Sequence, residues 1–427
     1  MLNPTQPYFY LLAYLAVLYI RPHEFVPFFM GWPVLPILLM LAFLFWLMRQ
    51  PKNFEAPQFR LMPVLTLAMM LSLVFTGWIG GGLAVLSEFA PVVMLFYMVA
   101  TSTDSLQRVR QIFLVLSVSV TVLSWHGIDQ IEKGIGWTGA ELSQGSRITY
   151  LGFLNDPNDL AMALVMILPM ILHLGHGAGR IVRWITYAAA GAVAYAVYLT
   201  NSRGSVLAMG AMVFLYGILR YGVLKSVLVI PVLLIPLIAF GPSRMAEMSA
   251  DEDSAEGRIE AWYEGVQLLI MRPLFGVGKG QFADYHGLTA HNSFVLAFAE
   301  LGLVGYFVWL SNIVISWLML QRIVRSEALV DASPEALSQW EETRGAARTL
   351  WYGYVAGLVS AFFLSRSYVV ILYLHIALIV AVFQMARAQR PDLPPIGWLE
   401  RWGQMLALTL GSVVGLWLLT RVLLSFT

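Results

Sequence analysis

Two polar residues, His291 and Asn292, stand directly before a stretch that is apolar enough to enter a lipid bilayer, in LTAHNSFVLAFAELG at 288–302. If a helix begins at 292, the positive end of its dipole disfavours the imidazolium form, so we expect a neutral ring with one nitrogen able to accept a proton. Asn292 or Ser293 would cap the helix or orient the ring. The pattern suggests a general base, although a lone interfacial histidine is more often structural.

Arginines occur where a charge is costly. Two arginines fall between apolar stretches that have almost no loop between them, namely Arg203 in TNSRGS and Arg366 in LSRSY. Arg147, in the expected loop 126–158, is a weaker case of such a charge near the membrane. Charges at membrane depth usually face a cavity or a partner, with snorkelling to lipid headgroups as the alternative. Because guanidinium groups bind phosphates bidentately, several arginines at one membrane surface favour a phosphate or pyrophosphate ligand.

The segment 241–291 is too long for a simple turn between membrane helices, and loops of this length are usually functional or disordered. Its apolar residues at helical spacing predict an amphipathic helix over 254–271, with Arg258 in the first turn. The residues that define the apolar face are Ile259, Trp262, Tyr263, Val266 and Ile270. Arg258 is either a ligand-binding cation or a solvated charge.

GVGKGQF, at 276–282, looks at first like a phosphate-binding loop. It lacks the Gly-Lys-Ser/Thr sequence that opens a helix after a strand in nucleotide-binding loops, so that interpretation is rejected. We expect a glycine-rich bend in which Lys279 is able to contact an anionic lipid.

FLNDPNDLAM, at 153–162, places four polar residues just before another apolar stretch. A proline turn with an Asn or Asp helix cap is the simpler interpretation. The alternative is a divalent-metal site that uses Asp156 and Asp159, because hard cations bind carboxylate oxygens. Asn155 and Asn158 are candidate substrate-binding residues in the same motif.

The composition is that of a membrane protein. Of the 427 residues, 59% are hydrophobic and only 12% are charged, far from the roughly 25% charged content of soluble domains. Apolar stretches long enough to cross a bilayer predict an all-α, polytopic protein. The twelve or thirteen expected spans are about 8–20, 31–48, 61–77, 83–100, 110–125, 159–174, 182–199, 204–219, 223–240, 292–320, 349–364, 368–386 and 404–425. Glu88 and Glu300, inside two of them, are candidate counter-charges to buried arginines.

Every second loop is rich in Lys and Arg, which predicts that these loops face the cytoplasm and that 126–158 and 241–291 lie outside. The chain is expected to be one membrane domain, 1–427, with 241–291 as its large periplasmic loop. With no cysteine, the redox compartment stays open, and a net charge of +1 argues against a nucleic-acid partner.

The ordered set of motifs resembles the O-antigen ligase (WaaL) and O-antigen polymerase (Wzy) superfamily of bacterial membrane glycosyltransferases. The matching pieces are FLNDPNDLA, NSRGS, GRIEAW, RPLFGVGKGQF and HNSFVLAFAELGLVGY, in that order over about 150–310. No single motif is specific, but their order is. The opening stretch also looks like ligase-like proteins associated with protein-sorting loci, so the acceptor stays open.

This resemblance implies a metal-independent, inverting transfer at the periplasmic face of the inner membrane, without a cofactor. A glycan would pass from undecaprenyl pyrophosphate to lipid A-core oligosaccharide. By motif position, Arg203 and Arg258 would neutralise the pyrophosphate and His291 would be the general base, all three converging on one cavity. The candidate substrate-binding residues are Arg147, Asn155, Asn158, Lys279, Asn292 and Arg366, and no metal ligand is expected.

Three other functions remain open. An O-antigen polymerase would use the same donor with another lipid-linked glycan as acceptor, and a protein O-glycosylation ligase would modify a protein side chain. A transporter is the alternative from another class, and it would place its binding residues near the bilayer midplane. Here the unusual charges cluster at the outer ends of spans, which favours chemistry at the surface.

Overall fold

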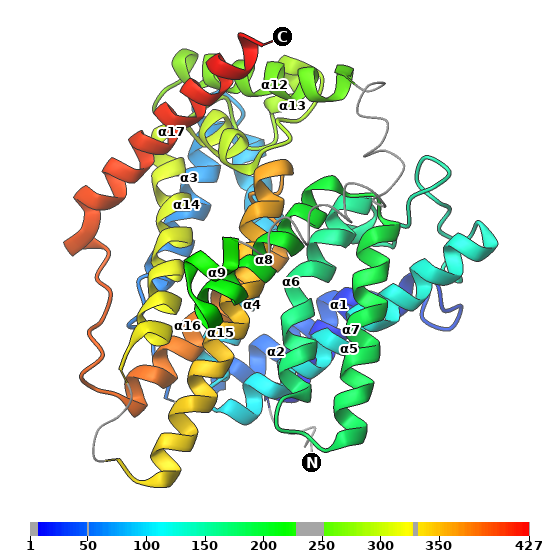
Figure 1. Cartoon of the computed structure of the whole chain (residues 1–427). Coiled ribbons are helices and arrows are strands. Elements are labelled where there is room, and N and C mark those ends of the chain that lie inside the picture. Colours follow the sequence, from blue (N-terminus) through cyan, green and yellow to red (C-terminus); the bar gives the residue numbers. More distant parts are fainter. Residues whose placement is uncertain (1–6, 49–50, 228–251, 328–331, 427) are drawn as a thin grey trace. The chain divides into compact units, whose positions relative to one another are not determined.

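The computed structural model describes residues 7–48, 51–227, 252–327 and 332–426. Helices make up the regular structure there, and the bridges Ile135–Glu141 and Ser143–Arg147 are the extended pairings between described residues (Figure 1). The all-helical expectation is confirmed. The chain divides into two compact units, and each is assembled from three separate segments.

Unit 1 comprises Met1–Lys52, Thr101–Glu247 and Glu327–Ser360. Its helices are α1 (Pro7–Ile20), α2 (Val34–Met48), α5 (Leu106–Lys133), α6 (Pro157–Gly175), α7 (Arg180–Leu199), α8 (Arg203–Tyr221), α9 (Val223–Val227) and α15 (Pro334–Phe363) as far as Ser360, with short 3-10 turns η1 (Pro22–Glu24) and η2 (Gly152–Leu154). Helix α6 is almost entirely buried and packs against α5, α7 and α8, so it is the core of this unit.

Local sequence explains where two of these helices begin. Helix α5 follows Ser105, whose side chain accepts a hydrogen bond from the Arg108 backbone N–H. Helix α6 follows Asp156, whose carboxylate accepts from the Asn158 N–H, and Pro157 occupies the first helical position, where no N–H is needed. Capping residues therefore fix the start of the buried helix next to the polar motif.

Unit 2 comprises Asn53–Ala100, Met248–Ser326 and Ala361–Thr427. Its helices are α3 (Gln58–Val74), α4 (Ile79–Ser102) as far as Ala100, α12 (Glu252–Met271), α13 (Phe282–His286), α14 (Ser293–Arg325), α16 (Val370–Gln389) and α17 (Trp402–Leu424), with the 3-10 turn η3 (Leu399–Arg401). Helix α14 packs against α3, α12, α16 and α17, so it is the central element of this unit.

Helix α14 is interrupted at Gly302, whose backbone adopts φ 64° and ψ −171°. The interruption leaves backbone groups without helical partners, and the segment 273–278 satisfies four of them. Leu303 and Val304 donate to the carbonyls of Pro273 and Leu274 at 2.8 and 3.2 Å. Val277 and Gly278 donate to the carbonyls of Ala299 and Glu300, each at 3.0 Å.

The glycine-rich stretch 276–282 is therefore a bend, as predicted, and its first residues form hydrogen bonds with the backbone of α14 at the Gly302 break. Gly276, Gly278 and Gly280 all have positive φ, which glycine adopts without strain. A Cβ on Gly276 would lie 2.3 Å from the Glu300 carbonyl oxygen, so the two backbones approach too closely for a side chain.

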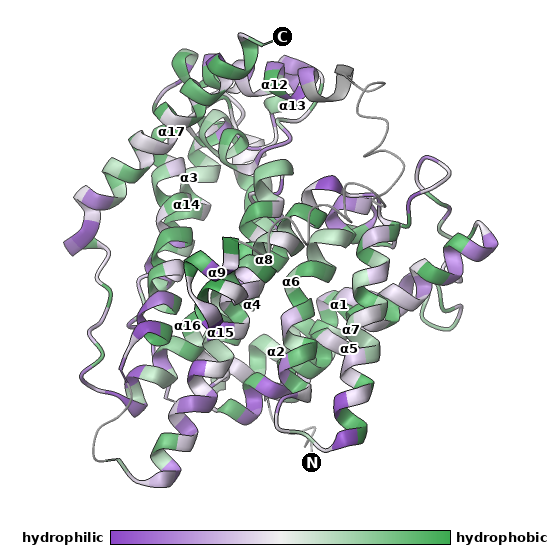
Figure 2. Cartoon of the chain, in the orientation of Figure 1, coloured by the Kyte–Doolittle hydropathy of each residue, from purple (hydrophilic) through white to green (hydrophobic). Residues whose placement is uncertain are grey.

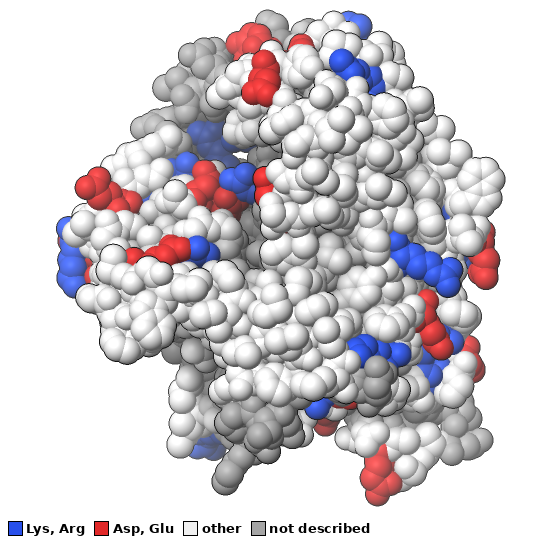
Figure 3. Space-filling model, turned by 180° about the vertical axis from the view of Figure 1, so that it is seen from behind, with Lys and Arg blue, Asp and Glu red and all other residues white. Residues whose placement is uncertain are grey.

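Eight described helices are long and apolar enough to cross a membrane, and α1, α2 and α3 are shorter apolar helices. Green, hydrophobic residues dominate the helices in Figure 2, and uncharged residues cover most of the face in Figure 3. The expected spans coincide with helices, except that 223–240 lies mostly outside the described residues. Helices α5 and α15 extend beyond 110–125 and 349–364. The number of crossings and the periplasmic loop stay predictions.

We expect Gly302→Ala to lower the thermal unfolding temperature of the detergent-purified protein. The alanine Cβ would meet the Leu274 carbonyl carbon at 2.4 Å, and a backbone at φ 64° and ψ −171° lies in a region that is essentially restricted to glycine, which costs other residues about 1–3 kcal/mol. Gly411→Ala in α17 is the control, because its Cβ would meet no atom within 4 Å. Equal unfolding temperatures for the two variants would contradict this account of the break.

Candidate functional site

Arg147 joins two of the predicted motifs in unit 1. Its side chain is buried, with 8% exposed. The guanidinium donates from Nε to the Thr200 carbonyl at 2.8 Å and from Nη2 to Asn158 Oδ1 at 2.9 Å. Arg147 therefore ties the start of α6 to the turn between α7 and α8, and it brings Asn158 close to TNSRGS.

The motif FLNDPNDLAM forms the turn and helix cap that the simpler interpretation predicted. Asp156 Oδ1 accepts from the Asn158 backbone at 2.7 Å, which is a capping contact. Asn155 follows η2 and is exposed. Since the cap engages Asp156, the motif has a structural role independent of any ligand.

Arg203 is the first residue of α8, directly after the turn that Arg147 holds. Ser202 precedes the helix and Asn201 has φ 51°, a left-handed conformation that asparagine tolerates. The Arg203 side chain is half-buried. A guanidinium at a helix N-terminus adds a positive side chain to backbone N–H groups that already favour anions.

A polar cluster that sequence reasoning missed lies at the end of α1 in unit 1. Arg21 has φ 53° and pairs with Glu24, and its guanidinium fills the space that a Cβ on Gly152 would need. The Tyr150 hydroxyl donates to the Ile20 carbonyl at 2.6 Å. Burial and the Arg21 charge lower the pKa of His23, although Glu24 opposes them. The available sequence signal was RPHE, four residues with three ionisable side chains after an apolar stretch.

His291 and Asn292 begin α14 in unit 2. Asn292 is the cap, and its Oδ1 accepts from the backbones of Phe294 and Val295 at 2.9 and 3.1 Å. His291 precedes the cap with φ 50° and is half-buried. Asn292 is fully buried, and its Nδ2 has no hydrogen-bond partner in the described part of the chain. A buried amide of this kind calls for a water or a ligand atom.

Ser293 joins the start of α14 to the loop that carries Arg366. Its hydroxyl donates to the Leu364 carbonyl at 2.6 Å and accepts from the Arg366 N–H at 2.8 Å. Ser367 donates to the Ser293 carbonyl at 2.7 Å. The structure thus brings the backbone of Arg366 next to His291 and Asn292, as close neighbours of one serine.

The loop that carries Arg366 is also held by hydrogen bonds from two buried aromatic residues. Trp309 Nε1 and the Tyr373 hydroxyl both donate to the Ser367 carbonyl at 2.9 Å. Burial raises the pKa of the Tyr368 phenol well above its usual value, and the nearby Glu300 carboxylate raises it further. Tyr368 therefore stays protonated as a neutral part of the support.

Lys279 is not a free cation. Its Nζ pairs with Glu88, and its backbone N–H donates to Ser72 at 3.0 Å. Glu88 is therefore the counter-charge of a lysine and not of an arginine as expected. Glu300 is buried in α14 and accepts hydrogen bonds from the backbone N–H groups of Gly280 and Phe282. These contacts differ from the expected pairing of Glu300 with a buried arginine.

Arg258 lies in the second turn of α12, because the helix begins at Glu252 instead of 254. Its side chain is half-buried, one turn from Trp262, whose ring meets Phe362 edge to face at 5.4 Å. Gly265 approaches Val295 so closely that a Cβ would clash, which places α12 against the first turn of α14. The buried face includes Trp262 and Val266 as expected, but Ile270 is exposed.

The candidate residues thus form two groups. Unit 1 holds Arg147, Asn155, Asn158 and Arg203, and unit 2 holds Arg258, Lys279, His291, Asn292 and Arg366. Arg147 links the first group and Ser293 links much of the second. The convergence of Arg203, Arg258 and His291 on one cavity stays a prediction.

We expect Ser293→Ala to loosen the loop at 364–367, because it removes two hydrogen bonds and leaves a buried carbonyl and N–H without their partner. Each such loss costs about 1–3 kcal/mol. Hydrogen–deuterium exchange of peptides that cover the loop should become faster. Ser311→Ala is the matched control in the same helix, since Ser311 is buried and its hydroxyl has no hydrogen-bond partner within the described residues. Unchanged exchange in Ser293→Ala would refute the link.

Comparison with known families gives these groups a context. Residues 188–310 match the family model described as O-antigen ligase. A search of curated protein sequences found no match. The matched segment contains Arg203, Arg258, Lys279, His291 and Asn292, and it ends inside α14. The described part of the chain therefore has the apolar helices of a multi-pass membrane protein, and its segment 188–310 is similar to the O-antigen ligase family.

Proposed function

We propose that this protein is an O-antigen ligase that transfers a glycan from undecaprenyl pyrophosphate to lipid A-core oligosaccharide. The reaction would occur at the periplasmic face of the bacterial inner membrane. The observation that carries the proposal is the O-antigen ligase match over 188–310, which contains Arg203, Arg258 and His291. The family implies lipid-linked glycan and acceptor substrates in general, and the acceptor chosen here is the finer proposal.

In this mechanism His291 is the general base. One ring nitrogen accepts the proton of an acceptor sugar hydroxyl while the oxygen attacks the anomeric carbon of the donor. The bond from that carbon to the pyrophosphate oxygen breaks on the opposite face, so the configuration inverts. The position before the α14 cap supports this role, because the positive end of a helix dipole disfavours an added positive charge.

Arg203 and Arg258 stabilise the leaving group. The pyrophosphate gains negative charge as the glycosidic bond breaks, and fixed guanidinium groups stabilise that charge best where water is scarce. The positive charge of the arginines takes the place of a divalent metal, so the proposed reaction is metal-independent. The helix N-terminus at Arg203 supports anion binding there.

The remaining candidates have supporting roles. Arg366 and Lys279 supply further positive charge near the lipid-linked phosphate, with Lys279 shared with Glu88. Asn155 is exposed and available to a sugar. Arg147 and Asn158 hold the turn before Arg203, and Asn292 caps the helix that follows His291, so these three act mainly by positioning.

We expect His291→Ala to slow glycan transfer by about 10²–10⁴-fold, because a placed general base contributes about that much. Purified protein in detergent with EDTA is mixed with undecaprenyl-pyrophosphate glycan and lipid A-core, and the gel mobility of the acceptor is followed. His286→Ala, five residues earlier in α13, is the matched histidine control.

The outcomes separate the alternatives. A ladder of heavier acceptor with wild type and His286→Ala, but not His291→Ala, supports the proposal. Equal rates in all three proteins would keep the ligase and remove His291 from its chemistry. Wild type that lengthens the lipid-linked glycan and leaves lipid A-core unchanged would establish a polymerase instead.

We expect Arg203→Gln to reduce the rate constant of transfer by about 10²–10³-fold, the usual loss for one donor to a developing anion. Arg203→Lys should be intermediate, because lysine keeps the charge but not the bidentate geometry. Arg220→Gln, at the opposite end of the same helix, is the control. A normal rate in Arg203→Gln would exclude this arginine from the leaving-group site.

A further inference from the structure

An open hollow of about 530 Å³ lies at the C-terminal end of α14 in unit 2, far along that helix from His291. It is lined by Leu318, Gln321, Arg322 and Arg325 of the last two turns of α14, by Ser326 directly after the helix, and by Leu393, Pro394 and Arg401. Three of the lining residues are arginines, namely Arg322, Arg325 and Arg401. We call it the arginine hollow.

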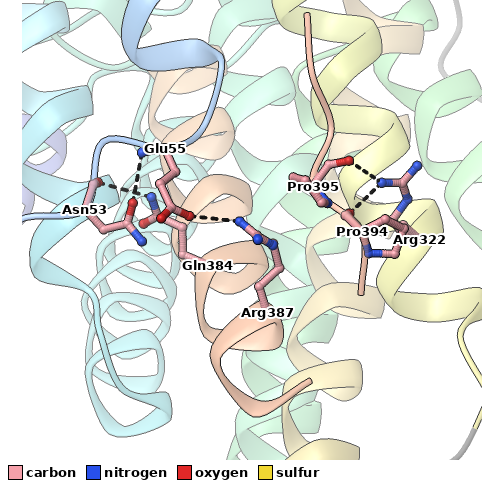
Figure 4. A network of polar contacts seen from close by, with 7 residues as sticks. All are labelled: Asn53, Glu55, Arg322, Gln384, Arg387, Pro394 and Pro395. Carbon is pink, nitrogen blue, oxygen red and sulfur yellow. Dashed lines mark hydrogen bonds and ion pairs between the residues drawn. The ribbon is translucent and has the colours of Figure 1, made fainter. Parts of the chain in front are cut away.

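Arg322 is held in a fixed position at its wall. Its Nη1 donates to the carbonyls of Pro394 and Pro395 at 2.6 and 2.8 Å, so the guanidinium spans from α14 to the segment before η3 (Figure 4). Its Nε and Nη2 make no hydrogen bond with the described residues. One edge is therefore anchored to the protein and the other is available to a ligand.

The charge of the arginine hollow is unbalanced. Arg322 and Arg401 lie near enough to repel each other, and no Asp or Glu is among the described residues that line the hollow. Asp392 pairs with Arg390 at 3.0 Å, and Glu327 and Glu400, the acids next to Arg325 and Arg401 in the sequence, are not among the described residues that line the hollow. Like charges held together in this way favour a bound anion.

The surroundings of the arginine hollow are those of a membrane interface. Leu399 and Trp402 flank Arg401 and are 66% and 60% exposed. Exposed tryptophan beside arginine is typical of the boundary between headgroups and hydrocarbon. The part of α14 after the Gly302 break, 303–325, is an unbroken helix about 34 Å long, enough to cross a bilayer of about 30 Å. The basic-loop pattern predicts that this end faces the cytoplasm.

We propose that the arginine hollow binds the phosphate-bearing headgroup of an anionic membrane phospholipid at the face opposite His291. Arg322 supplies a fixed guanidinium edge, while Arg325 and Arg401 complete a cationic rim. Leu399 and Trp402 offer apolar surface to the acyl chains. Basic pockets on this side of membrane proteins are suited to such headgroups.

A simpler account is that these arginines only balance the negative end of the α14 dipole. That account explains Arg322 and Arg325, which are in the last turn of the helix. It does not explain Arg401, which belongs to η3 and comes to the same hollow from another part of the chain. Convergence of charges from two elements on one concavity is the feature that favours a ligand.

The test uses the full-length protein in detergent, titrated with phosphatidylglycerol or with zwitterionic phosphatidylcholine, with bound lipid counted by native mass spectrometry. We expect one retained phosphatidylglycerol and weaker retention of phosphatidylcholine. Arg325→Gln should weaken phosphatidylglycerol binding about fivefold, the effect of one basic residue at a membrane surface. Arg325 is exposed and makes no hydrogen bond with the described residues, so its loss leaves folding intact.

Two comparisons make the result decisive. Arg180→Gln removes another exposed arginine, at the start of α7 in unit 1, and should leave phosphatidylglycerol binding unchanged. An equal loss in Arg180→Gln and Arg325→Gln would show general surface attraction and overturn the proposal. In the second comparison, inorganic phosphate is added to the wild-type protein with bound phosphatidylglycerol. Full displacement of the lipid at millimolar phosphate would assign the hollow to a soluble phosphate instead. The assay needs no glycan transfer, so its outcome is independent of the ligase proposal.

Discussion

The structure of unit 2 depends on the need to satisfy buried backbone groups where α14 is broken. In an apolar environment an unpaired N–H or carbonyl is expensive. The break at Gly302 creates such groups, and the segment from Pro273 to Gly278 supplies partners for four of them. The glycine-rich bend is therefore held by the helix that it completes. Lys279 directly follows this segment, so its position is determined by the backbone hydrogen bonds between the segment and α14.

The same helix organises the polar residues at its N-terminal end. Asn292 uses its side chain for the cap, which frees Ser293 to bind the loop before α16. That loop receives two further hydrogen bonds at the Ser367 carbonyl from buried aromatic residues. A rigid support of this kind suits a reaction that needs a base and cations in fixed positions, because misplacement of a catalytic group by about 1 Å can cost 10²-fold in rate.

Much of this was predictable from the sequence. Hydrophobic length gave the all-helical membrane fold, and the motif order gave the family that the match over 188–310 confirms. Polar residues between closely spaced spans located Arg203 at a helix start and Arg366 in a short loop between helices. The pairing of Lys279 with Glu88 was not predictable, because it joins segments about 200 residues apart, and the Glu300 contacts depend on the bend at 276–282. The break at Gly302 was hidden as well, since one glycine in an apolar helix has many explanations.

The two groups of candidate residues share one local backbone feature. Among the described residues, four that are not glycine have positive φ, and they include Asn201 and His291. Each directly precedes the capping residue of a helix, Ser202 for α8 and Asn292 for α14. The left-handed conformation strains His291, whereas asparagine tolerates it at 201, and such strain persists only where surrounding contacts over-determine it. Arg147 and Ser293 provide those contacts in their respective units. A residue with positive φ thus precedes the N-cap position of both helices, but Asn292 also caps its helix through its side chain, whereas Ser202 makes no such hydrogen bond.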